Sequence, residues 1–492
     1  MDEPPAETPR TPADRPGPEI PRRIKLVIGL LLAASFVMIL NETVMSVAIP
    51  KLMTELSVTA ATAQWLTTAF MLTMAVVIPT TGLILQRFTT RAVFIGAMSL
   101  FSGGTLLAAI APVFGFLVAA RVIQAGGTAV MLPLLITTVL TFVPADRRGR
   151  TMGLITIVIS VAPAVGPTFS GFILSVLGWR WMFLSVLPIA MLSLALGAGL
   201  VKNITEPKSV KFDLPSVLLS AVTFGCLIYG LSSIGEAAES DATVPPGLPI
   251  AIGAAALVLF VRRQIVLQRG DAALMDLRPF RDRAFVVGTV MLVISMGALF
   301  GTLILLPIYL QNVLGLTTLE TGLVLLPGGL AMGLIAPLIG WLFDRFGPRP
   351  LVIPGSMVAA GALGLMNLLD QTSATEFALG ANLMLMIGLG LLMTPLMTSA
   401  LGSLRPELYA HGSAIVNTLQ QLAGAAGTAL FITVMTTGTA ANLEAGMEPA
   451  AAQSGGIHVA FRCGTALALV AVAASFLVKR PPESAAEAMS AP

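Results

Sequence analysis

Charged residues are scarce in this sequence. They make up 11% of its 492 residues, whereas a soluble domain carries about a quarter. Hydrophobic residues make up 56%, so the polar groups cannot cover a surface that faces water. This composition excludes a large soluble helical protein. Cysteine and histidine are also rare, with two of each, so neither a disulfide framework nor a metal site is expected.

Signatures of enzymes are missing as well. No G-x-x-x-x-G-K-[ST] loop is present, and the longest polar connection, "GDAALMDLRPFRDR" at 270–283, is too short for a nucleotide-binding domain. No nucleophile–base pattern appears. The sequence therefore predicts a protein that is not an enzyme and has no cofactor, and any transport must draw on an ion gradient. His411, next to a predicted loop, is expected to be a surface histidine, with a proton relay as the less favoured alternative.

Long apolar segments dominate the rest of the chain, and each can cross a bilayer of about 30 Å. They are continuous, unlike the alternating strands of barrels, so an all-α integral membrane protein is expected. The first is too long for a cleaved leader. The fourteen predicted spans are 26–49, 62–85, 91–111, 113–142, 151–173, 180–201, 214–234, 247–267, 284–310, 318–343, 350–368, 375–401, 411–436 and 457–478.

Basic residues gather in alternate connections. The other connections hold few of them and contain the acidic stretches "GEAAESD" and "NLEAGMEP". The positive-inside rule makes the basic set cytoplasmic, which predicts a multi-pass protein of the cytoplasmic (inner) membrane with both termini inside. The basic set comprises Arg22, Arg23, Lys25, Arg87, Arg91, Arg147, Arg148, Arg150, Lys202, Lys208, Lys211, Arg262, Arg263, Arg269, Arg278, Arg281, Arg283, Arg345, Arg349, Arg405, Lys479 and Arg480.

Two turns indicate an internal repeat. "GLILQRFTTR" at 82–91 and "GWLFDRFGPR" at 340–349 place Gly, Arg, Phe and Arg at matching offsets, and parallel repeats are typical of transporters. Two unrelated turns are the alternative. The repeat predicts two six-helix bundles plus an inserted helix pair. The expected boundaries are a disordered tail at 1–23, bundles at 24–202 and 284–480, the inserted pair with its flanking loops at 203–283, and a disordered tail at 481–492.

Five stretches together resemble the major facilitator superfamily, and most closely its fourteen-helix drug:proton antiporter branch. They are the two turns above, "RVIQAGGTAVMLP", "APAVGPTFSG" and the opening "LNETVMSVAIP", which resembles a lincosamide-resistance subgroup. The chain departs from the pattern at Gln86, which replaces an acid, and at Ser170, which replaces a glycine. The acid of helix 1 stands at Glu42, one residue later than in many members. The resemblance implies gating or conformational roles for Gly166, Pro167, Gly340, Asp344, Arg345, Gly347 and Arg349.

Glu42 is an acid inside the first apolar run. Counting back from Pro50 places it roughly 12 Å from the outer helix end, and counting from Pro112 places Arg121 roughly 13 Å deep. A lone charge there costs at least about 2.5–3.5 kcal/mol, so both should face the protein interior or a wet cavity. A poorly hydrated carboxylate holds its proton more tightly, whereas a nearby arginine favours the ionised form. We expect Glu42 and Arg121 to couple transport to protons; a permanent structural ion pair is the alternative.

Polar and flexible side chains lie on the same helix faces as Glu42 and Arg121, and on one further helix. Met38 and Met45 flank the acid at helical spacing, Gln124 shares a face with the arginine, and Asn417 and Gln421 form a polar patch on the thirteenth predicted helix. Met surfaces adapt to varied ligands, so we expect these five residues to bind substrate. The alternative for the amides is hydrogen bonding between helices.

These observations predict a proton-coupled exporter of amphipathic, drug-like compounds. A lipid or envelope-metabolite exporter, a proton-coupled importer and a non-transporting scaffold or receptor are the alternatives. The expected partners are the small-molecule substrate, protons and membrane lipids. No nucleic acid is expected, and the protein is expected to be a monomer.

Overall fold

The computed structural model describes residues 21–58, 60–201, 203, 213–237, 245–270 and 272–478. The predicted tail at 481–492, almost all of the tail at 1–23 and most of the acidic stretch at 235–241 lie outside these residues. The described part consists of helices and connections, without strands. This arrangement is all-helical, as the continuous apolar runs predict.

Seven helices, called here the N-terminal set, come first in the chain. They are α1 (Arg22–Glu55), α2 (Ala60–Val77), α3 (Thr81–Arg87), α4 (Thr90–Ala109), α5 (Phe114–Phe142), α6 (Arg148–Val176) and α7 (Arg180–Leu200). Within the set, α1 packs on α6, α4 packs on α5 and α7, and α2 packs on α5. The short α3 continues the direction of α2 through the 3₁₀ turn η2 (Ile78–Thr80).

The remaining helices form two further groups. The inserted pair is α8 (Leu214–Ala237) and α9 (Gly247–Leu267), which pack on each other. The C-terminal set is α10 (Arg283–Ile308), α11 (Thr318–Phe346), α12 (Arg349–Met366), α13 (Thr375–Gly402), α14 (Tyr409–Glu444) and α15 (Pro449–Ser475). Short helical turns include η3 (Ala145–Arg147), η4 (Gln268–Gly270), η5 (Arg278–Arg281), η6 (Tyr309–Val313, a π-helix) and η7 (Pro406–Leu408).

Within the described residues, thirteen helical stretches are long and apolar enough to cross a membrane. The long helix α6 covers the predicted span at 151–173 but is not among the thirteen. The protein is therefore a multi-pass membrane protein, and the number fourteen stays a prediction.

Local sequence explains where key helices begin and end. Thr317 and Glu320 form a capping box at the start of α11. Gly347 ends that helix with φ of 80°, a backbone conformation that favours glycine. At the start of α10, the Asp282 side chain accepts a hydrogen bond from the Phe285 backbone N–H. The cap at Gly347 defines the turn near which the predicted gating residues Asp344, Arg345 and Arg349 lie.

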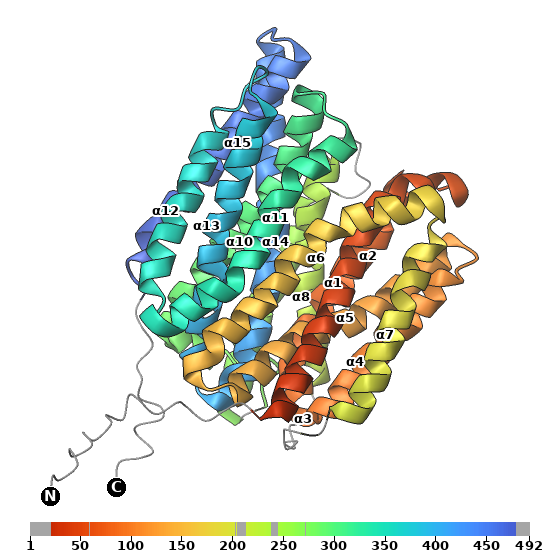
Figure 1. Cartoon of the computed structure of the whole chain (residues 1–492), viewed down its shortest axis with the longest axis vertical. Coiled ribbons are helices and arrows are strands. Elements are labelled where there is room, and N and C mark those ends of the chain that lie inside the picture. The colour runs from red at the N-terminus through yellow and green to blue at the C-terminus, as the bar shows by residue number, and fades with distance from the viewer. Residues whose placement is uncertain are drawn as a thin grey trace, which may run out of the picture.

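The two sets meet along α6 and α11, while α8 packs against both α2 and α14. In Figure 1 the two sets diverge away from the end at which α3 lies. Hydrogen bonds join the turns at that end to one another. We call it the basic end, because these turns carry Arg87, Arg147, Arg278, Arg345 and Arg405. The inserted pair thus bridges the N-terminal and C-terminal sets on the side of α2 and α14.

Candidate transport site

Arg121 lies on α5 and is completely buried, with partners on α1 and α2. Its Nη1 donates to Asn41 Oδ1 at 3.1 Å and to Gln124 Oε1 at 3.1 Å, and its Nε donates to the Leu66 carbonyl at 3.4 Å. The guanidinium carbon lies 4.1 Å from the centre of the Phe70 ring. Neutral acceptors and an aromatic face therefore hold this buried cation.

Glu42 is partly buried, whereas its neighbour Asn41 is only 1% exposed. Among the described residues, no ion pair within 4 Å joins Glu42 to Arg121, because Asn41 takes that place. Neighbouring residues on a helix point about 100° apart, so only one of the two can face the guanidinium squarely. The positive charge of Arg121 still acts on Glu42 through space. The described conformation thus holds an arginine and an acid that are near each other but not locked together.

Helix α6 packs closely on α1 at the two residues that follow Glu42 in the sequence. Ser170 Oγ donates to the Val44 carbonyl at 2.9 Å. A Cβ atom at Gly166 would lie 3.0 Å from Cβ of Thr43, so glycine permits this approach. The helix runs without interruption from Arg148 to Val176. The motif "APAVGPTFSG" therefore contacts the turn of α1 that carries the acid.

Asp344 joins the two sets at the basic end. Its carboxylate accepts from the Gly149 N–H at 2.7 Å and from the Arg150 N–H at 2.9 Å, which are free donors in the first turn of α6. A carboxylate in this position also interacts favourably with the helix dipole. Asp344 thus ties the end of α11 to the start of α6.

Small residues allow α6 and α11 to approach closely beside this contact. A Cβ atom at Gly149 would lie 2.5 Å from the Gly340 carbonyl oxygen, and one at Gly153 would lie 2.9 Å from the carbonyl carbon of Ala336. Close backbone approach through small residues is the usual way in which membrane helices associate. Gly340, for which the resemblance implies a gating role, lies at this crossing.

Two further contacts close the basic end between the sets, and a third joins the sets deeper in the molecule. Gln86 on α3 lies 2.8 Å from Nε2 of His411 on α14, and Arg148 Nη1 donates to the Tyr409 hydroxyl at 3.3 Å. Deeper in the molecule, hydroxyls of α6 and α13 share a hydrogen bond of 2.8 Å, from Thr156 to Thr394. Hydrogen bonds therefore hold the two sets together at this end in the described conformation.

The predicted substrate residues do not form one surface here. Met38 and Met45 are buried in two different apolar clusters. Gln124 belongs to the arginine network, where its Nε2 donates to Thr105 Oγ1 at 2.8 Å. Asn417 and Gln421 lie on α14, where Asn417 Nδ2 donates to the Ser413 carbonyl at 2.8 Å. Their role in binding stays a prediction.

The other predicted gating residues surround the end of α11. Arg345 is exposed and lies over the Trp341 and Phe346 rings, at 5.7 and 5.4 Å. Arg349 begins α12 and is also exposed. Of the predicted gating residues in this turn, Asp344 alone forms side-chain hydrogen bonds with the start of α6 within the described residues.

Two residues of the site escaped the sequence interpretation. The prediction that His411 is a surface histidine was wrong, because it is 6% exposed and packed beneath the connection between α9 and α10. Asn41 stands at the position where, by the resemblance, many members carry an acid. A signal for it was present: an amide at the same depth as Arg121 can supply an acceptor without a second charge.

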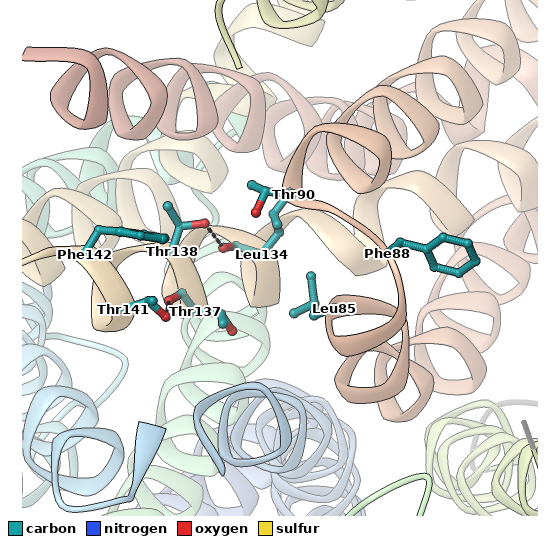
Figure 2. Close-up of a pocket in the computed structure, with 8 residues that line it drawn as sticks. All are labelled: Leu85, Phe88, Thr90, Leu134, Thr137, Thr138, Thr141 and Phe142. Carbon is teal, nitrogen blue, oxygen red and sulfur yellow. Dashed lines mark hydrogen bonds between the residues drawn. The ribbon is translucent and has the colours of Figure 1, made fainter. Parts of the chain in front are cut away.

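A small recess lies at the basic end, between the α3–α4 turn and the last turns of α5 (Figure 2). Thr138 in its wall donates to the Leu134 carbonyl at 2.7 Å. The predicted coupling, substrate and gating residues do not line it, so it is separate from the candidate site. Its lining residues are Leu85, Phe88, Thr90, Leu134, Thr137, Thr138, Thr141 and Phe142.

Substituting Gly340 tests the closeness of the α6–α11 crossing. Gly340→Val is expected to lower the stability of the closed form by about 1–3 kcal/mol, because the new side chain meets the backbone of Gly149. Thermal unfolding in detergent measures this. Gly364→Val is the matched control, since a Cβ atom there meets nothing within 4 Å. Equal losses of thermal stability in both variants would show that the α6–α11 crossing can accommodate a side chain at Gly340.

An all-helical membrane protein whose two helix sets close on each other through repeated turns has the architecture of a secondary transporter. The sequence profile of the Major Facilitator Superfamily matches residues 31–428. The chain belongs to this family, and it is a transporter rather than an enzyme.

Its relatives include drug-resistance proteins. The chain is 41% identical to the lincomycin resistance protein LmrB of Listeria monocytogenes over 92% of this chain and 96% of that protein. It is 40% identical to the uncharacterized MFS-type transporter YcnB of Bacillus subtilis, over 93% and 95%. It is 32% identical to a multidrug resistance protein B homolog of Mycobacterium tuberculosis, over 88% and 81%. The structure of the human organic anion transporter MFSD10 matches with a TM-score of 0.62 at 15% identity, covering 93% of this chain and 100% of that one, which supports the fold.

Proposed function

We propose that this protein exports amphipathic, drug-like compounds across the cytoplasmic membrane in exchange for protons. The observation that carries the proposal is the position of Glu42. It is a partly buried acid beside, but not paired with, the Arg121 network, and it lies on the turn of α1 that α6 contacts. The resistance proteins named above support the substrate class.

In this mechanism, Glu42 binds a proton or gives it up as its surroundings change. Burial favours the neutral acid and the nearby guanidinium favours the carboxylate, so a small movement of either shifts the balance. A cationic compound near Glu42 would also favour the carboxylate. Proton release and substrate binding are thereby linked, and no cofactor is involved.

Helix α6 offers a rigid connection from this acid to the gate. Its first turn donates to Asp344, and its Gly166–Ser170 stretch packs on α1 next to Glu42. These two contacts lie roughly 25 Å apart along the helix. A change in the protonation of Glu42 that moves α6 relative to α1 would therefore strengthen or break the hydrogen bonds of Asp344 at the basic end.

Transport in cells tests the proposal. Expression in a bacterial host without its own efflux pumps should lower the accumulation of a cationic dye several-fold and raise resistance to lincomycin. An uncoupler should remove both effects. Higher accumulation would instead indicate an importer, and changed envelope lipids with normal dye levels would indicate a lipid exporter.

The basic end is proposed to face the cytoplasm, and cysteine labelling checks this orientation. Cys226 and Cys463 are first replaced by serine. A cysteine at exposed Thr372, in the α12–α13 connection, should react with an impermeant maleimide in intact cells. One at exposed Glu407, in η7, should react only after permeabilisation. The reverse pattern would overturn the orientation.

A further inference from the structure

The connection from Ala272 to Asp282, called here the linker, leads from the inserted pair to α10. Most of its first half is buried, and consecutive backbone N–H groups are held alternately by two helices. The N–H groups of Met275 and Leu277 donate to Gln264 Oε1 at 3.2 Å and Gln268 Oε1 at 3.3 Å, at the end of α9. The N–H between them, that of Asp276, donates to His411 Nδ1 on α14 at 3.3 Å. The linker therefore lies between the inserted pair and the gate.

Hydrogen bonds between α8 and α9 fix the end of the inserted pair that contacts the linker. Arg263 on α9 donates to both carboxylate oxygens of Asp213 at the start of α8, at 2.8 and 2.9 Å, and this holds the pKa of Asp213 below its usual value. Gln264 Nε2 donates to Ser216 Oγ at 2.8 Å. Gln264 thus uses its nitrogen toward α8 and its oxygen toward the linker.

The ring of His411 has one acceptor, and the linker uses it. A neutral imidazole accepts at one nitrogen and donates at the other. Since Nδ1 accepts from Asp276, Nε2 carries the proton and needs an acceptor. The Gln86 amide nitrogen lies 2.8 Å from Nε2, and rotating that amide by 180° brings its oxygen to this position to accept the hydrogen bond. His411 therefore contacts α3 with one nitrogen and the linker with the other.

The surroundings of His411 leave little room for a different arrangement. A Cβ atom at Gly82 on α3 would lie 2.9 Å from Nδ1 of the ring. On the linker side, Arg278 donates through its backbone N–H and its Nε to the Asp276 carboxylate, at 2.8 and 2.6 Å, and so shapes the turn that presents the Asp276 N–H. The ring is thus enclosed by α3, α14 and the linker.

We propose that His411 is a positioning residue that latches the linker of the inserted pair onto the closed gate. The inserted pair thereby acts as a strap across the basic end. Separation of the N-terminal and C-terminal sets there must break the contact of α3 with the imidazole, in addition to the Asp344 and Arg148 contacts. This role goes beyond the proposed exchange of protons and substrate, and it does not depend on the identity of the substrate.

Two substitutions separate the two contacts of the ring. In His411→Asn the amide oxygen takes about the place of Nδ1 and can still accept from Asp276. In His411→Gln the amide nitrogen reaches about the place of Nε2, which keeps the contact to Gln86 and loses the linker. The reporter is Ala273→Cys, a buried linker position, in protein that lacks Cys226 and Cys463. Maleimide labelling is measured in nanodiscs, where both faces are accessible and no transport is needed.

The latch predicts about tenfold faster labelling in His411→Gln and in His411→Ala, and a rate within about twofold of the parent in His411→Asn. A cysteine at exposed Glu407 should label equally in all variants. Equal rates in the Asn and Gln variants would overturn the proposal. If one variant does not purify well, the rate of hydrogen exchange in the 272–282 peptide is compared among the remaining variants. An unchanged exchange rate of the Asp276 amide in His411→Gln would likewise overturn the proposal.

Discussion

Protein carrying Glu42→Gln is expected to fold and insert but to lose uphill transport driven by a pH gradient. Glutamine keeps the size and much of the hydrogen-bonding capacity of the acid, but it cannot release a proton. Because Glu42 has no ion pair with Arg121 in the described conformation, its neutralisation leaves the buried network of Arg121, Asn41 and Gln124 intact. The loss should therefore fall on coupling and not on stability.

Proteoliposomes with an imposed pH gradient measure this loss. Substrate accumulation against its gradient should fall to background, while downhill exchange and thermal stability remain close to those of the parent. Asn41→Asp is a useful companion variant, because it places a carboxylate directly on the guanidinium. It should not restore coupling to Glu42→Gln if an acid free of that ion pair is required. Uphill transport by Glu42→Gln at the parental rate would make the acid structural.

Substitutions of Arg121 should also impair coupling, for a different reason. Arg121→Ala removes the positive charge that favours the carboxylate form of Glu42, and it leaves Asn41 Oδ1 and the Leu66 carbonyl without their buried donor. Arg121→Lys is expected to keep part of the function, since the charge remains although the planar fork is lost. A comparison of transport with thermal stability separates the two effects.

Asp344→Asn is expected to reduce transport at least about tenfold, far more than Gln86→Ala. Hydrogen bonds to a charged group contribute about 1.5–3 kcal/mol each and neutral ones about 0.5–1.5 kcal/mol. Asp344 accepts two such bonds from Gly149 and Arg150, whereas Gln86 makes one neutral contact with His411. Asparagine can satisfy one of the two N–H groups, but its NH₂ group opposes the other.

Initial transport rates in proteoliposomes test this asymmetry between the two repeated turns. Glu407→Gln, an exposed acid at the same end, is the control and should leave the rate within about twofold. Equal effects of Asp344→Asn and Gln86→Ala would contradict asymmetric closure. The hydrogen bonds of Asp344 to the start of α6 would then contribute no more to closure than the contact between Gln86 and His411.

Much of the fold follows from the sequence because membrane helices must satisfy their own backbone hydrogen bonds. Long apolar runs therefore predict helices, and the repeated turns at 82–91 and 340–349 place Gln86 and Asp344 at one end. The depth of Arg121 follows from counting residues along α5. These inferences need only local periodicity and the thickness of a bilayer.

The partners of the site residues could not be obtained in this way. Whether Asn41 or Glu42 faces Arg121 depends on the rotation of α1, and the two positions differ by a single residue. The burial of His411 depends on a linker that arrives from a distant part of the chain. The contact of Gly149 with Gly340 likewise arises only when α6 and α11 cross, and no pattern within either helix specifies its partner.

The most direct test of proton exchange is proton movement on substrate addition in everted vesicles. Vesicles that contain the protein are first acidified inside, and a lincosamide or a cationic dye is then added outside. The proposed mechanism predicts that substrate dissipates the pH gradient in vesicles with the parent protein and not in vesicles with Glu42→Gln. Substrate uptake without any proton efflux, or equal dissipation by Glu42→Gln, would contradict it.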